Sequence, residues 1–174
     1  MTIFRRASAG LVVSGALTLG LFYAPALTYA DFNGVKLVNA KTGKCLTIAG
    51  GVSTENNVTA LQFDCDSDPS RTWTLNEMSN GSFEIRNVKT GKCLTIAGGV
   101  STENNVTAVQ FDCDRDPSRT WTLNGDVPNG SFEIRNVKTG KCLTIAGGVS
   151  TENNVEALQF DCDNDPSRTW RMNG

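Results

Sequence analysis

Three pairs of cysteines are the residues of this chain with the clearest potential for chemistry. The two members of each pair lie twenty residues apart, whereas zinc sites use closer spacing, so disulfides are expected in a protein that leaves the cell. Six cysteines allow fifteen pairings, and the near-identical segments around each pair favour one bond per segment. We therefore predict the disulfides Cys45–Cys65, Cys93–Cys113 and Cys142–Cys162, which leave no thiol to act as a nucleophile.

Closely spaced carboxylates are the second candidate for chemistry. Asp64, Asp66 and Asp68 superficially match the first ligands of a calcium-binding loop. No glycine follows at the turn and no glutamate closes the twelve-residue frame, so neither a metal site nor a cofactor is predicted. Local charge pairing is expected instead, with Arg71 facing Asp68 or Asp64.

Catalysis is not predicted. The chain contains no histidine, which removes the commonest general base. Each candidate carboxylate occurs three times, whereas acid–base catalysis needs two groups whose environments push their pKa values apart.

Residues 1–30 have the pattern of a secretory signal peptide. Arg5 and Arg6 precede an apolar stretch, and the small residues Thr28 and Ala30 come before a plausible cleavage point at Asp31. The stretch is too short and too interrupted by Gly and Ser for a membrane span. We expect a secreted, extracellular protein of residues 31–174 that no membrane segment retains.

The predicted mature chain is acidic. It carries 14 Lys and Arg residues against 18 Asp and Glu residues, which argues against nucleic acid or an anionic membrane as a partner. Its length is that of one ordinary domain.

One thirty-residue segment occurs three times along the chain. The segment 44–73 returns almost unchanged at 92–121 and at 141–170, and the segments 80–125 and 129–174 differ at only five positions. A unit of this length cannot cover its own apolar face. We therefore expect three repeats, about 31–78, 79–127 and 128–174, that share one core in a single domain.

Each repeat is predicted to contain four short strands joined by turns. Residues 83–87 alternate apolar and polar side chains, and further strands are predicted at 44–48, 59–63 and 71–76, with a turn at 68–71. No segment shows sustained helical periodicity. The prediction is an all-β fold of about twelve strands, and threefold closure fits three repeats better than a propeller.

The motif "GKCLTI…FDCD…RTW", present three times, resembles the ricin B-chain type of lectin, whose units carry a "CLD" strand and a "QxW" ending. The resemblance covers the whole predicted mature chain. It implies a β-trefoil with pseudo-threefold symmetry, in which Trp73, Trp121 and Trp170 belong to the core. A tryptophan at a fixed repeat position also indicates packing in its own right.

The resemblance further implies a shallow sugar pocket on each repeat, with an aromatic platform, a carboxylate and amides. The ring is kept as Phe63, but Thr47 replaces the carboxylate, Ser70 the amide and Arg71 the glutamine. Asn57 could supply a neutral partner for sugar hydroxyls. The candidate carbohydrate-binding residues are Thr47, Asn57, Phe63, Ser70, Thr95, Asn105, Phe111, Ser118, Thr144, Asn154, Phe160 and Ser167.

Two alternatives stay open for these residues. Asn56 and Asn57 could simply turn the chain, because asparagine tolerates left-handed geometry, and Phe63 could pack in the core. The favoured function is a monomeric, non-catalytic carbohydrate-binding protein with up to three equivalent sites. The alternative is a disulfide-stabilised trefoil that binds a protein, as an inhibitor or envelope-associated factor, after losing its sugar sites. Loss of the family's Asp in every repeat favours this alternative, whereas retention of Phe and Asn favours the lectin.

Overall fold

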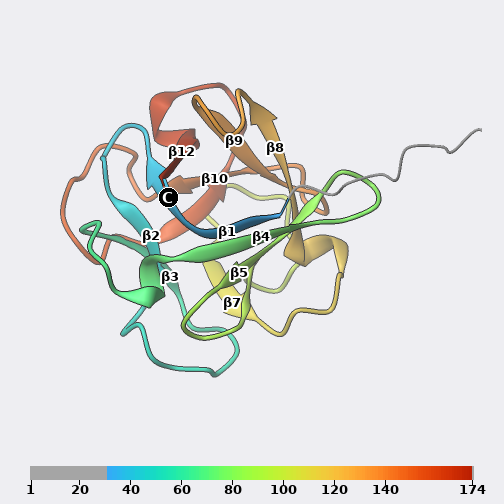
Figure 1. The fold of residues 1–174 in the computed structure, drawn as a ribbon. Coiled ribbons are helices and arrows are strands. Elements are labelled where there is room, and N and C mark those ends of the chain that lie inside the picture. The colour runs from blue at the N-terminus through green and yellow to red at the C-terminus, as the bar shows by residue number, and fades with distance from the viewer. Residues whose placement is uncertain (1–30, 174) are drawn as a thin grey trace, which may run out of the picture.

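The structure of the protein is a computed structural model that describes residues 31–173, so the predicted signal peptide lies outside the described residues. The described residues form twelve strands and three short 3-10 helices (Figure 1). The all-β β-trefoil prediction is confirmed. Within this part of the chain, no helix is long and apolar enough to cross a membrane.

Six strands close into an antiparallel barrel. Each strand pairs with two neighbours in the circular order β1–β4–β5–β8–β9–β12, and β12 returns to β1. Closure removes free sheet edges, so each repeat depends on the other two. The barrel strands are β1 (Phe32–Asn39), β4 (Trp73–Glu77), β5 (Phe83–Asn87), β8 (Thr120–Gly125), β9 (Phe132–Asn136) and β12 (Thr169–Asn173).

The other six strands form three hairpins, and single β-bridges such as Thr59–Val109 join one hairpin to the next. The hairpins are β2–β3 (Cys45–Ile48 and Ala60–Phe63), β6–β7 (Cys93–Ile96 and Ala108–Phe111) and β10–β11 (Cys142–Ile145 and Ala157–Phe160). A 3-10 helix follows each hairpin: η1 (Pro69–Arg71), η2 (Pro117–Arg119) and η3 (Pro166–Arg168).

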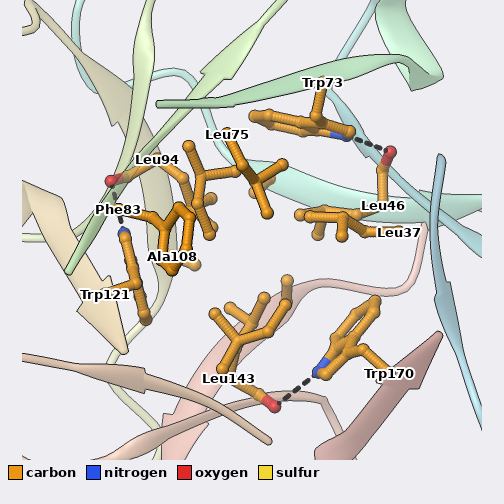
Figure 2. Packing of buried hydrophobic residues seen from close by; sticks show 14 of the residues in the cluster. Leu37, Leu46, Trp73, Leu75, Phe83, Leu94, Ala108, Trp121, Leu143 and Trp170 are labelled. Carbon is orange, nitrogen blue, oxygen red and sulfur yellow. Dashed lines mark hydrogen bonds between the residues drawn. The ribbon is translucent and has the colours of Figure 1, made fainter. Parts of the chain in front are cut away.

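The three tryptophans surround a common core, as predicted. Trp73, Trp121 and Trp170 are fully buried. Each indole N–H donates a hydrogen bond of 2.9–3.0 Å to the carbonyl of a leucine on the second strand of its own repeat (Figure 2). The buried polar end of the ring is thereby satisfied, while its apolar body belongs to the core cluster that also contains leucines such as Leu37 and Leu75.

The predicted disulfides are confirmed. Each bond links the start of a hairpin to the loop after it, with Cα atoms 5.1 Å apart, and the described residues contain no free cysteine. A loop of this length contributes about 3 kcal/mol in the chain-entropy treatment. Such bonds are typical of an oxidising, extracellular environment.

Candidate functional site

Each repeat contains one pocket between its hairpin and its 3-10 helix. The first-repeat pocket has a volume of about 280 Å³, and the second- and third-repeat pockets have about 360 Å³ each. The first-repeat pocket is lined by, among others, Val52, Phe63, Asp68, Ser70, Arg71 and Asn154. Pockets of this size accommodate a small ligand.

A glycine pair shapes the rim of each pocket. Gly50 and Gly51 have φ values of +68° and +67°, in the left-handed region that favours glycine. A Cβ atom on Gly51 would lie 2.9 Å from Oγ of Ser70, so only glycine lets the loop approach the 3-10 helix this closely. The following residue, Val52, is left 71% exposed at the rim.

Phe63 lines the pocket and does not join the core cluster. Cζ of Arg71 lies 4.3 Å from the ring centroid, and the equivalent distances in the other repeats are 4.3 and 4.4 Å. The guanidinium therefore covers one face of the ring in a cation–π contact. The same guanidinium lies 3.3 Å from Asp66 and 3.6 Å from Asp68, which confirms the predicted pairing of Asp68 with Arg71.

Thr47 and Ser70 form the floor of the pocket, but their polar groups have partners inside the protein. Thr47 is 3% exposed, and its hydroxyl donates to the Ser70 carbonyl at 3.0 Å. The same carbonyl accepts a hydrogen bond of 2.8 Å from the amide of Asn87, a residue of the next repeat. The threonine that replaces the family's carboxylate thus fixes η1 in position.

A carboxylate nevertheless reaches each pocket from another position. Asp68 caps η1, and its Oδ1 accepts a hydrogen bond of 2.8 Å from the backbone N–H of Ser70. This hydrogen bond is the main reason that the pKa of Asp68 is lowered, and the charges of Lys89 and Arg71 add to it. The equivalent Asp116 and Asp165 line the other two pockets. The Asp-Pro pair signals such a cap, although the sequence prediction treated it only as a turn with an ion pair.

The candidate asparagine of each repeat lies in the pocket of a neighbouring repeat. Asn57 lines the second-repeat pocket, Asn105 the third-repeat pocket and Asn154 the first-repeat pocket. Asn57 therefore lies away from Thr47, Phe63 and Ser70 of its own repeat. The φ value of Asn57 is +66°, so the residue also turns the chain.

Buried glutamines hold the asparagine loop of one repeat against the hairpin of another. Gln62 is fully buried on β3 and donates to the carbonyls of Ser150 and Glu152, at 2.8 and 2.7 Å. Its backbone carbonyl accepts the N–H of Asn154 at 2.9 Å. The loop of the third repeat is thus held along the strand beside Phe63. Gln110 and Gln159 hold the corresponding loops of the first and second repeats.

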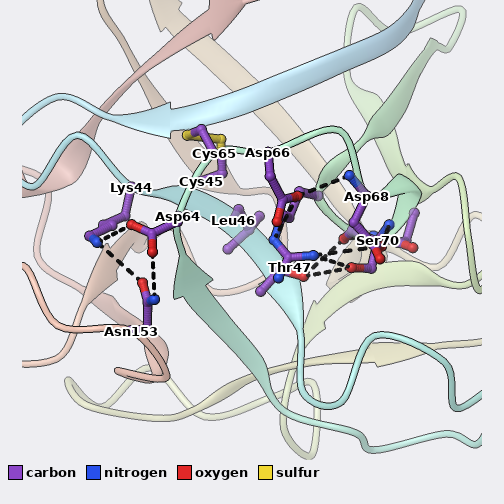
Figure 3. A network of polar contacts seen from close by, with 12 residues as sticks. Lys44, Cys45, Leu46, Thr47, Asp64, Cys65, Asp66, Asp68, Ser70 and Asn153 are labelled. Atoms are coloured by element: carbon purple, nitrogen blue, oxygen red, sulfur yellow. Dashed lines mark hydrogen bonds and ion pairs between the residues drawn. A yellow bond between two sulfur atoms is a disulfide. The ribbon is translucent and has the colours of Figure 1, made fainter.

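The aspartates that superficially resemble calcium ligands point to different partners (Figure 3). Asp64 accepts hydrogen bonds from Lys44 and from the amide of Asn153, whereas Asp66 and Asp68 face Arg71. The predicted alternative ion pair between Asp64 and Arg71 is wrong, because Lys44 takes that place. The hydrogen bond from Lys44 is the main cause that lowers the pKa of Asp64.

The structure is similar to several solved β-trefoils. Its TM-score with ThreeFoil, a designed threefold-symmetric protein, is 0.75 at 21% identity, over 80% of this chain and 97% of ThreeFoil. The Macrolepiota procera ricin B-like lectin, solved with lactose, gives a TM-score of 0.65 at 16% identity, over 81% of this chain and 95% of the lectin. Likeness at these identities shows the fold alone.

A further similar structure is the exo-beta-1,3-galactanase 1,3Gal43A from Clostridium thermocellum, with a TM-score of 0.73 and 25% identity. The similarity covers 86% of this chain but only 31% of the enzyme. No curated protein sequence matches the chain. The sequence profile of the ricin-type beta-trefoil lectin domain-like family matches residues 23–112 and 117–174, so the chain belongs to this family.

Proposed function

We propose that the protein is a secreted, monomeric, non-catalytic carbohydrate-binding protein with one sugar site in each repeat. One observation carries the proposal: each pocket combines exposed apolar surface with polar groups held in fixed positions. In the first-repeat pocket the apolar residues are Val52 and Phe63, and the polar ones are Asp68 and Asn154.

This combination matches the chemistry of a pyranose ring. A sugar has an apolar C–H face, which packs on apolar side chains, and hydroxyls that need fixed partners because an unpaired buried hydroxyl costs about 1–3 kcal/mol. The ionised carboxylate of Asp68 accepts from such hydroxyls, and its backbone hydrogen bond holds it in place before a ligand arrives. Asn154 offers both a donor and an acceptor.

The proposed ligand contacts differ from the first set of candidates. Phe63, Phe111, Phe160 and the three asparagines keep a direct role, whereas the buried threonines and serines support the pocket from below. Asp68, Asp116 and Asp165 supply the carboxylate. Three sites on one chain would raise the avidity for a polymer by about 10² or more where their spacing permits simultaneous binding.

A glycan array, followed by calorimetry on the glycans that bind, tests the proposal. The informative variant is Val52→Ser/Val100→Ser/Val149→Ser, because these side chains are 71% exposed and their loss should leave the fold intact. We expect about a tenfold loss of affinity at each site, from the lost apolar contact with the ligand.

The matched control is Val88→Ser/Val137→Ser, which changes exposed valines outside the three pockets and should leave affinity unchanged. Equal loss in both variants would contradict the proposed sites. Absence of binding to every glycan would favour the alternative, a trefoil that binds a protein. The observation behind that alternative is the guanidinium on one face of each phenylalanine ring, which limits stacking there.

A further inference from the structure

The second- and third-repeat pockets each contain a lysine supplied by another repeat. Lys138 lines the second-repeat pocket and Lys41 lines the third-repeat pocket. Both residues are exposed, and neither ammonium group takes part in a hydrogen bond or ion pair among residues 31–173. The other cation in each pocket, Arg119 or Arg168, is paired with an aspartate at 3.0–3.1 Å. The ammonium is therefore the cationic group still available to a ligand.

The fold fixes the backbone of these lysines beside the pockets. The side-chain amide of Asn136 donates to the Ser118 carbonyl, on the pocket floor, at 2.8 Å. The backbone N–H of Lys138 then donates to Oδ1 of Asn136 at 3.0 Å and to the Pro117 carbonyl at 3.1 Å. Asn39 attaches the turn that carries Lys41 to Ser167 in the same way. The backbone of each lysine is thus held beside the pocket by hydrogen bonds.

We infer that the second- and third-repeat pockets prefer a sugar with an anionic substituent, a carboxylate or a sulfate ester, and that Lys138 and Lys41 determine this preference. The inference rests on the proposed carbohydrate binding and names its ligand class. Asp116 would accept hydrogen bonds from hydroxyls on one side of the ring, while the ammonium of Lys138 would pair with the anionic group on the other.

The charge around the pockets supports a local contact rather than long-range attraction. The predicted mature chain is acidic overall, so a dense polyanion would be repelled by most of the surface. A single acidic group that enters the pocket meets the unpaired ammonium at short range. A sugar with isolated acidic groups therefore fits better than a heavily sulfated chain.

The first-repeat pocket provides an internal control. The equivalent lysine, Lys89, does not line that pocket, although its charge adds to the hydrogen bonds that lower the pKa of Asp68, just as the charges of Lys138 and Lys41 do for Asp116 and Asp165. We therefore expect Lys89→Gln to change binding less than the double variant Lys41→Gln/Lys138→Gln.

The test is calorimetry with four probes: trigalacturonate, its carboxyl-reduced neutral form, a sulfated galactan oligosaccharide and its desulfated form. The two pairs distinguish a carboxylate from a sulfate ester. We expect the wild type to bind at least one acidic probe more tightly than its neutral form. Lys41→Gln/Lys138→Gln should weaken that binding about fivefold and leave the neutral probe unchanged, because exposed charge pairs contribute up to about 1 kcal/mol. Lys89→Gln should have less than a twofold effect.

Equal affinity for acidic and neutral probes, or an acidic preference that survives the double substitution, would overturn the inference and leave carbohydrate binding intact. Binding to neutral glycans on the array with no binding of either acidic probe would have the same consequence. Absence of binding to any glycan would overturn both the inference and the proposed function.

Discussion

The first repeat differs from the other two in how the loop before its 3-10 helix is held. In the second repeat, a carboxylate oxygen of Glu84 accepts the backbone N–H of Arg115 at 2.8 Å, and Glu133 holds Asn164 at 2.9 Å in the third. In the first repeat, Lys36 stands where the others have glutamate. The first-repeat pocket is also the smallest of the three, at about 280 Å³ against 360 Å³.

The backbone conformation of this loop also differs between the first repeat and the other two. Arg115 and Asn164 have φ values of 61° and 60°, a left-handed conformation that is unfavourable for most residues, whereas Ser67 at the equivalent place does not adopt it. The glutamate hydrogen bond stabilises that conformation. Repeats with nearly the same pocket residues therefore differ in how the loop before the 3-10 helix is held, because the supporting contact comes from a barrel strand whose sequence differs in the first repeat.

Substitution of the buried glutamines should give the largest difference in the free energy of unfolding between repeats. In the first repeat, Oε1 of Gln62 accepts the Thr42 hydroxyl at 2.8 Å, whereas Oε1 of Gln110 and of Gln159 has no partner among the described residues. Gln62→Leu should lower the free energy of unfolding by about 3 kcal/mol and Gln110→Leu by about 2 kcal/mol, since Gln62 loses one more hydrogen bond. Urea unfolding measures both values, and equal losses would contradict the assigned difference.

The glutamines also illustrate what the sequence could and could not predict. Strand alternation, the cysteine spacing and the repeated tryptophan depend on local pattern, and they led to the correct fold and disulfides. The contact between Gln62 and the loop at Ser150 spans 88 residues and exists only once the barrel is closed. The position of Asn154 beside Phe63 follows from that contact, so the sequence of one repeat does not indicate which pocket its asparagine lines.

Local sequence patterns also failed where two functions compete for one residue. Asp68 reads equally well as a turn residue, an ion-pair partner or a ligand contact, and the structure shows it capping η1 while it lines the pocket. Arg71 replaces the family's glutamine, but its position over Phe63 depends on side-chain packing that the spacing alone does not specify.

Removal of the Glu84 or Glu133 side chain should give the next largest loss of stability. Glu84→Ala and Glu133→Ala each leave a backbone N–H without its carboxylate partner, so each should lower the free energy of unfolding by about 1–2 kcal/mol. Each should also weaken the proposed sugar binding in its own repeat, because the released loop carries the pocket aspartate. Calorimetry and urea unfolding measure the two effects. Lys36→Ala is the control, with a change below about 0.5 kcal/mol; a loss as large as that of Glu84→Ala would contradict the comparison.

The reverse change should make the first repeat resemble the others. Lys36→Glu/Ser67→Asn introduces both the acceptor and a residue that tolerates left-handed geometry. We expect the free energy of unfolding to rise by about 0.5–1 kcal/mol, the net value of one hydrogen bond. Ser67→Asn alone should bring no such gain, and a double variant no more stable than this single variant would show that the contact does not form.

The smallest expected effect concerns the carboxylates at the hairpin ends. The pKa values of Asp64, Asp112 and Asp161 are lowered by hydrogen bonds from a lysine and an asparagine. A lowered pKa in the folded state means that the ionised groups stabilise the protein above the ordinary value of 3.8, and that this contribution is lost as the pH falls through the lower folded value. The triple Asp→Asn variant should therefore show less change in melting temperature between pH 5 and pH 2 than the wild type.

The three carboxylates should also titrate differently when their lysines are removed. The hydrogen bond from Lys44 is the main cause for Asp64, whereas the bond from Asn56 is the main cause for Asp112. Lys44→Met and Lys92→Met should each raise the pKa of their aspartate, and the shift should be larger for Asp64 because Lys44 also contacts Asn153, the second donor to that carboxylate. Carboxyl carbon NMR during an acid titration measures both shifts. Lys44 also donates to Oδ1 of Asn153 at 3.2 Å, so its loss weakens the second donor to Asp64. Equal shifts in the two variants would mean that the contact between Lys44 and Asn153 does not affect Asp64.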